Sequence, residues 1–170
     1  DGKLLDEGKW LIGGLTRLGG ALMAFGNRDR GSFVRLTQGK EAPNTVTWGQ
    51  FNRKALIRLP IVPMDAEGNK VTAPTIEFRL PDGSTHPHLL LAGIAQCIST
   101  GKAEKNLDAR IEETKAETAA ATSGGGAPVP KNFAEVRVEL EKNRNALEAG
   151  KVFPTHMIDS ILTSLSEEGE

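Results

Sequence analysis

The first segment of the chain has the apolar period of a helix, yet it is rich in glycine. Between residues 3 and 25, apolar side chains recur at spacings of three, four and seven positions, so they form one apolar face along a helix. Five glycines lie within this segment, and a glycine in a helix interior costs about 1 kcal/mol relative to alanine. A helix over residues 1–25 therefore needs a partner surface, and we expect the missing side chains to let that partner approach closely. The glycines are Gly8, Gly13, Gly14, Gly19 and Gly20.

The next region, residues 31–82, has the shorter period of β-strands. Partly alternating apolar segments are separated there by glycines and prolines, a pattern that favours short strands joined by loops. The loop over residues 63–70 can turn the chain between the last two strands, and an antiparallel pair is the simplest result. The expected strands are Ser32–Leu36, Thr45–Phe51, Ala55–Ile61 and Pro74–Leu80.

Helical patterns return in the second half of the chain. Pro87 stands at a favourable first-turn position, and Asn132 with Glu135 makes a capping pair. Residues 102–121 are polar and alanine-rich, and form either a solvated helix or a mobile segment. The order of helix, strands and helices indicates an α+β protein, a single domain or a fragment of one over residues 1–170. The expected segments are a helix over 87–101, a linker over 122–130 and terminal helices over 132–167.

Composition narrows the classes of protein to which the chain can belong. Its 170 residues suit about one domain. Lysine and arginine total 21 against 22 acidic residues, and this net charge of −1 argues against a nucleic-acid partner held by bulk positive charge. No apolar run approaches the ~18 residues that span a bilayer, and no segment has the pattern of a signal peptide. One cysteine, Cys97, allows no internal disulfide, so we expect a cytoplasmic setting and a buried, unreactive thiol.

The strongest candidate for chemistry is the alternating stretch over residues 75–80. On a strand, Glu77 and Arg79 share one face, and Arg58 can join them if the preceding strand pairs with this one. Two interpretations are open. Alternation alone favours a solvated face with a cross-strand ion pair. The alternative is a carboxylate ready for a hard cation, beside guanidinium groups suited to phosphate or carboxylate.

Other polar residues carry weaker signals. Glu41 lies in a polar loop and Arg53 just before a strand, and each by itself is an ordinary solvated residue. His86 and His88 flank a proline and could ligate a metal. Because two isolated imidazoles do not complete a site, a pair of polar side chains at a helix start is the favoured interpretation.

Three motifs occur in succession along the chain. They are R-L-x-x-G-x-E-A-P over residues 35–43, N-R-x-A-x-x-R-x-P over residues 52–60 and I-E-F-R-x-P-D over residues 76–82, and a proline-led helix follows them. This series resembles the C-terminal half of the catalytic domain of glutamine synthetase. The resemblance covers most of residues 32–101 and extends more weakly through the terminal helices. It implies antiparallel strands that form part of a glutamine synthetase-like catalytic barrel, flanked by helices.

The resemblance implies binding roles for four charged residues. Glu77 matches a metal ligand of the ATP site, and a carboxylate is the right donor for Mg²⁺ or Mn²⁺. Arg58 matches a contact to the nucleotide phosphates. Arg35 and Arg79 match arginines that hold the carboxylate of the amino-acid substrate, a task that suits the bidentate guanidinium.

Two further residues match catalytic positions of the family. Arg53 matches the arginine that stabilises the transferring phosphoryl group. Glu41 matches the flap glutamate that closes over the site and helps take a proton from ammonium. In the implied reaction ATP phosphorylates the side-chain carboxylate of glutamate, and ammonia then displaces phosphate to give glutamine. The implied partners also include further copies of the chain, in a homo-oligomer whose active sites are shared between subunits.

The chain departs from the family pattern in places. Thr75 stands where the family has an arginine, and His86-Pro87-His88 replaces Asn-Pro-Tyr. The family's other metal-binding glutamates, its metal-binding histidine and its N-terminal domain lie upstream of the matched region, so we expect the 170-residue chain alone to be inactive. Three alternatives are a non-catalytic relative used for assembly or sensing, a relative that joins glutamate to another amine, and an unrelated α+β interaction domain.

Overall fold

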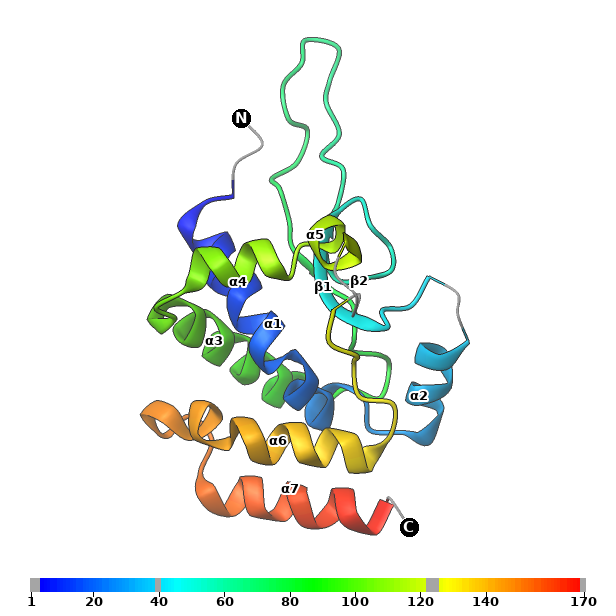
Figure 1. Cartoon of the computed structure of the whole chain (residues 1–170), viewed down its shortest axis with the longest axis vertical. Helices are drawn as coiled ribbons and strands as arrows, with labels where there is room; N and C mark the ends of the chain where they lie inside the picture. Colours follow the sequence, from blue (N-terminus) through cyan, green and yellow to red (C-terminus); the bar gives the residue numbers. More distant parts are fainter. Residues whose placement is uncertain (1–3, 39–40, 122–125, 169–170) are drawn as a thin grey trace.

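The computed structural model describes residues 4–38, 41–121 and 126–168. In chain order the described elements are α1 (Asp6–Gly26), α2 (Arg30–Thr37), β1 (Thr45–Gln50), β2 (Ala55–Leu59), β3 (Glu77–Phe78), α3 (Pro87–Ala103), α4 (Leu107–Glu113), α5 (Ala116–Ala121), α6 (Phe133–Glu148), the 3₁₀ turn η1 (Ala149–Lys151) and α7 (Thr155–Glu168). Figure 1 shows α1 in the middle of the molecule with α3 beside it. Helices α6 and α7 form successive layers on one side of α1, and the small sheet lies on another.

Helix α1 is the centre of the hydrophobic core. Every residue from 12 to 26 is buried except Arg17, so the helix is covered on nearly all sides. A helix buried in this way takes its stability from the elements packed around it rather than from its own helix propensity. This explains how a segment with five glycines persists as a helix.

Helix α3 approaches α1 so closely that glycine is required on both helices. A methyl group at Gly14 of α1 would overlap the backbone carbonyl of Cys97, and one at Gly101 of α3 would overlap the backbone carbonyl of Trp10. The expected close partner of the glycine-rich helix is therefore confirmed, and that partner is α3.

The sheet has the strand order β1-β2-β3. Strands β2 and β3 are antiparallel, with Arg58 opposite Glu77, which confirms the expected pairing of these two strands. Strands β1 and β2 are parallel, because residues 51–54 return the chain to the start of β1, where Ala55 pairs with Thr45. The sheet is thus mixed and is not closed. Closing a barrel needs more strands than the three described here, so the implied barrel is not confirmed.

The segment expected as a strand over Ser32–Leu36 is wrong, because it lies inside helix α2. Asp29 caps this helix by accepting a hydrogen bond from the N–H of Gly31 at 2.6 Å. Leu36 lies four positions after Ser32 and three after Phe33, so these buried residues share one helix face. Over only five residues, a pattern of alternating apolar and polar side chains fits a strand and a short amphipathic helix equally well.

The helices after residue 86 follow the expectations from the sequence. Helix α3 covers the segment expected to be helical, and the polar segment over residues 102–121 contains α4 and α5. Asn132 caps α6, since its Oδ1 accepts a hydrogen bond from the N–H of Glu135 at 2.8 Å. No helix within the described ranges is both long enough and apolar enough to cross a membrane.

The expected linker over residues 122–130 can be followed only in part. Residues 122–125 lie outside the described residues. Pro128 forms an isolated bridge to Thr45 at the start of β1, and the neighbouring Val129 is buried. The described end of the linker is therefore packed against the sheet.

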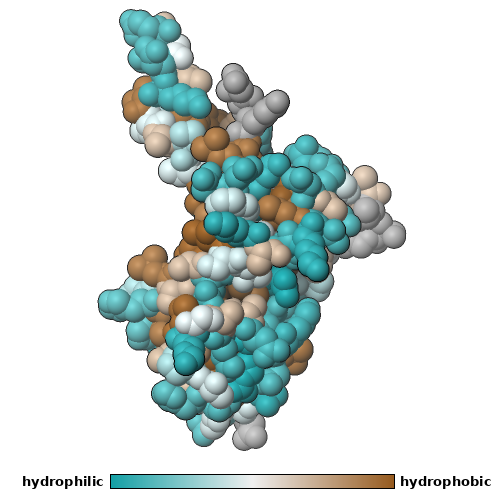
Figure 2. Space-filling view, turned by 90° about the vertical axis from the view of Figure 1, so that its left-hand side faces the viewer, coloured by the Kyte–Doolittle hydropathy of each residue, from teal (hydrophilic) through white to brown (hydrophobic). Residues whose placement is uncertain are grey.

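Residues 60–76 connect β2 to β3 and form a long projection (Figure 1). A bridge between Met64 and Lys70 makes it hairpin-like, as expected. At its tip the carboxylate of Asp65 accepts hydrogen bonds from Asn69, which hold the pKa of Asp65 below its usual value. Figure 2 shows a hydrophilic tip with hydrophobic residues gathered below it.

We predict that Gly14→Ala destabilises the protein by about 2–3 kcal/mol, because the backbone of α3 has to move to admit the methyl group. Urea unfolding followed by circular dichroism measures the loss. Gly83→Ala is the matched control, since a methyl group there meets nothing within 4 Å and should change stability by less than about 0.5 kcal/mol. Equal stability of the two variants would contradict the close α1–α3 contact.

We also predict that the thiol of Cys97 does not react in the native protein. The side chain is fully buried, and burial raises its pKa to about 12. At about pH 8, where an ordinary thiol with a pKa of ~8.5 is partly ionised, a disulfide reagent such as DTNB should label Cys97 only in urea. The same labelling rate with and without urea would show that Cys97 is accessible.

Candidate active site

Two arginines hold Glu77 on one face of the β2–β3 pair. Arg58 donates from Nη1 to Oε2 of Glu77 at 2.9 Å, and Arg79 donates from Nε to Oε1 at 3.0 Å. The exposed fractions of these side chains are 22% for Arg58, 14% for Arg79 and 41% for Glu77. The polar face that alternation indicates is therefore a partly buried ion cluster and not a freely solvated surface.

Glu41 and Arg53 extend this cluster from other parts of the chain. Arg79 donates from Nη2 to the backbone carbonyl of Glu41 at 2.9 Å. The carboxylate of Glu41 accepts hydrogen bonds from Nη1 of Arg53, at 3.0 Å to each oxygen. The loop before β1 and the connection between β1 and β2 thereby meet the segment that contains β3.

Arg35, in the last turn of α2, reaches the same region through backbone groups. Its Nη2 donates to the carbonyl oxygen of Arg79 at 3.1 Å and to that of Leu80. The structure thus brings together six of the seven charged residues that the three motifs specify, all except Asp82. We call them the six-residue cluster: Arg35, Glu41, Arg53, Arg58, Glu77 and Arg79.

The six-residue cluster has an excess of positive charge, because it contains four arginines and two glutamates. Three of its N–H groups are also buried without a hydrogen-bond partner among the described residues: Arg35 Nε, Arg58 Nε and Arg79 Nη1. A buried donor without an acceptor is unfavourable, so an anion that accepted from these groups would be stabilised. Carboxylate and phosphate are the anions that guanidinium groups recognise best.

The described residues provide one candidate ligand for a divalent cation, and not a complete site. Glu77 offers the carboxylate oxygens that Mg²⁺ and Mn²⁺ prefer. Within the part of the chain that the structure describes, no group of three or more His, Cys, Asp or Glu side chains could share a metal ion. The rings of His86 and His88 lie 6.1 Å apart at the start of α3, as polar side chains of a helix start would.

Thr75, where the resemblance leads us to expect an arginine, takes no part in the cluster. Its side chain is exposed and makes no hydrogen bond within the described ranges. Thr75 therefore does not supply the guanidinium group that the resemblance leads us to expect near Glu77.

Sequence reasoning missed Asn27, which helps to position the segment that carries the cluster. Asn27 is buried and donates from Nδ2 to the carbonyl of Leu80 at 2.8 Å and to the carboxylate of Asp82 at 3.2 Å. Burial by itself raises the pKa of Asp82. Hydrogen bonds from Ser32, Ser84 and Asn27 outweigh this effect, so the pKa of Asp82 stays below its usual value. No spacing rule reveals these contacts, because they join segments more than 50 positions apart.

Two solved structures share this fold. The glutamine synthetase of Plasmodium falciparum has a TM-score of 0.75 to this chain at 22% sequence identity, and the match covers 97% of this chain and 39% of that one. A structure described as a novel glutamine synthase homologue has a TM-score of 0.70 at 24% identity, covering 97% of this chain and 35% of the other.

Sequence relatives point to the same family. The glutamine synthetase of Azotobacter vinelandii is 36% identical over 178 aligned positions, which cover 97% of this chain and 34% of the relative. That of Streptomyces filamentosus is 32% identical over 158 positions, covering 92% of this chain and 33% of the relative. The chain thus spans about a third of the length of these relatives. The family model for the glutamine synthetase catalytic domain matches residues 1–170, and the chain therefore belongs to this family.

Proposed function

We propose that the chain is the C-terminal catalytic portion of an ATP-dependent ligase that joins glutamate and ammonia to form glutamine. The observation that carries the proposal is the six-residue cluster, in which Arg58 and Arg79 hold the carboxylate of Glu77 at 2.9 and 3.0 Å. Its excess positive charge and unpartnered N–H groups suit a reaction whose substrates and products are carboxylates and phosphates. The proposed setting is the cytoplasm, in a homo-oligomer that shares active sites between subunits.

The binding roles follow from the contacts within the cluster. Glu77 would contribute one oxygen ligand to a divalent cation, which supplies charge neutralisation to the phosphates of ATP when bound. Arg58, beside Glu77, would contact the nucleotide phosphates. Arg79 would hold the carboxylate of glutamate through its unpartnered Nη1. Arg35 would hold the same carboxylate, since it binds the backbone carbonyl of Arg79 and its own Nε has no partner among the described residues.

Glu41 and Arg53 would act at the reacting atoms. ATP transfers its γ-phosphoryl group to the side-chain carboxylate of glutamate, and Arg53 stabilises the charge that develops on that group. Ammonia then attacks the acyl carbon, the C–O bond to phosphate breaks, and Glu41 accepts the proton that the ammonium gives up. In the structure these two side chains pair with each other and are mostly exposed. An exposed ion pair is weak, so substrate can separate Arg53 from Glu41 at little cost.

A relative without this activity is the second candidate, because Thr75 leaves a nucleotide contact of the family pattern unfilled. A relative that joins glutamate to another amine would keep the same cluster. Comparing phosphate release with ammonia, with alkylamines and with no amine separates the three possibilities.

We predict that the intact protein carrying this segment releases phosphate in a reaction that depends on ATP and glutamate and increases with ammonia. In Glu77→Ala the rate should fall by about 10³-fold or more, because a metal ligand is lost and Arg58 and Arg79 lose their shared partner. A colorimetric phosphate assay measures the change.

The matched control is Glu167→Ala, which removes an exposed glutamate of α7 that has no side-chain partner among the described residues. It should keep the wild-type rate. Near-normal turnover of a folded Glu77→Ala variant would show that the metal assignment is wrong.

The 170-residue chain alone is predicted to release no phosphate above background from ATP, glutamate and ammonia. One carboxylate ligand holds a hard cation poorly, since such sites use several oxygen donors. The same phosphate assay tests the prediction, and catalytic turnover by this chain would contradict it.

A further inference from the structure

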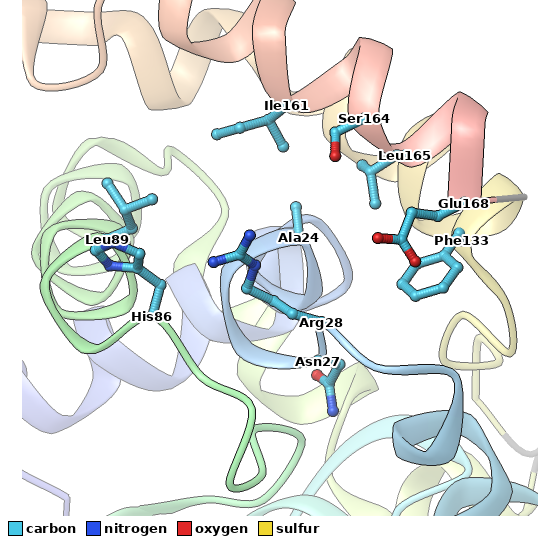
Figure 3. Close-up of a pocket in the computed structure, with 10 residues that line it drawn as sticks. All are labelled: Ala24, Asn27, Arg28, His86, Leu89, Phe133, Ile161, Ser164, Leu165 and Glu168. Atoms are coloured by element: carbon cyan, nitrogen blue, oxygen red, sulfur yellow. The ribbon is translucent and has the colours of Figure 1, made fainter.

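A pocket separate from the six-residue cluster lies where the end of α1, the start of α3 and helices α6 and α7 meet (Figure 3). Its volume is about 190 Å³. This is several times the ~30 Å³ that a water molecule occupies in the liquid, and less than the ~300–1,000 Å³ of sites for drug-sized ligands. The pocket therefore suits a molecule about the size of an amino acid.

One part of the pocket wall is apolar. Leu89 of α3, Phe133 of α6, and Ile161 and Leu165 of α7 contribute to it. In Figure 3 these side chains surround the space that the polar residues face. A ligand with a hydrocarbon side chain could bury it here and remove apolar surface from water.

Two opposite charges on exposed side chains face the pocket. The guanidinium group of Arg28, just after α1, reaches into it, and the carboxylate of Glu168, at the end of α7, is directed towards its middle (Figure 3). Within the described residues neither charged group has a hydrogen bond or an ion pair. A ligand with complementary charges would therefore bind without breaking an existing pair.

Asn27, another lining residue, contains a buried acceptor that has no donor among the described residues. Asn27 is 1% exposed, and its Nδ2 donates to the carbonyl of Leu80 and the carboxylate of Asp82. Because both partners are acceptors, the amide has only one sensible orientation, and Oδ1 is left without a hydrogen bond. Nδ1 of His86, another lining residue, is a second buried polar atom without a partner.

We propose that this pocket binds a small α-amino acid with an apolar side chain. Its carboxylate would pair with Arg28, its ammonium group would donate to Glu168, and its side chain would lie against Leu89 and Ile161. A ligand with only a carboxylate would pair with Arg28 alone, and a ligand with only an amine would pair with Glu168 alone. The two charges together therefore favour a zwitterion.

Titration of the ¹⁵N-labelled 170-residue chain with L-leucine, followed by NMR, tests the proposal. We expect saturable shifts of the amides of residues 27–28, 86–89 and 161–168, with a Kd on the order of 1 mM. Leucinamide, 4-methylpentanoate and glycine each lack one of the three recognised groups and should bind at least ~10-fold more weakly. Absence of a saturable shift, or equal binding of all four compounds, would overturn the proposal. So would shifts confined to the six-residue cluster, which instead support binding at the proposed substrate site.

Variants provide a second test. Arg28→Gln should weaken leucine binding by about 10-fold or more. Arg137→Gln removes an exposed arginine of α6 that has no partner in the described part of the chain, and it should leave binding unchanged. Circular dichroism verifies that both variants fold, and Glu168→Gln tests the ammonium side independently. Equal affinity of the Arg28 and Arg137 variants, or of Glu168→Gln and the wild type, would overturn the proposal.

Discussion

The attachment of the β3 segment to the end of α1 is the contact on which the candidate site depends. The carbonyls of Phe25 and Gly26 accept hydrogen bonds from N–H groups that follow β3, at 2.8 and 3.1 Å, and Asn27 adds a side-chain bond to the same segment. Helix α1 can serve as this anchor because it is buried on nearly all sides and meets the backbone of α3 at Gly14. Glu77 is therefore held by the core of the protein, although it lies in a strand of only two residues.

The six-residue cluster combines a well-held part with an adaptable one. Glu77 is partly buried and shared by two arginines, one of them on the neighbouring strand, so its position is defined by the sheet and by the core behind it. The pair of Glu41 and Arg53 is mostly exposed and lies on connections between elements. Such a division suits a site that binds charged substrates on a fixed surface and closes over them with a loop.

Much of this arrangement could be predicted from residues that act through local rules. Alternation identified the strand that carries Glu77, and the capping pair of Asn132 and Glu135 identified the start of α6. The same rules failed over Ser32–Leu36, because a few residues of mixed pattern fit a strand and a short helix equally well. They could not reveal Asn27 either, since its partners are far away in the sequence and a lone asparagine after a helix has no distinctive spacing.

By itself, the sequence determined that the chain is α+β, that its first helix requires a close partner, and which charged residues are grouped in motifs. These properties depend on the spacing of apolar residues, on residue type and on the order of residues along the chain, all of which are present before the chain folds. Only the tertiary structure decided that α3 is the partner, that β1 runs parallel to β2, and that the three motifs meet in one cluster. Each of these is a contact between distant segments. Such contacts depend on the packing of the whole core. Burial is favourable for any arrangement that removes apolar surface from water, so the local sequence pattern does not determine which surfaces meet.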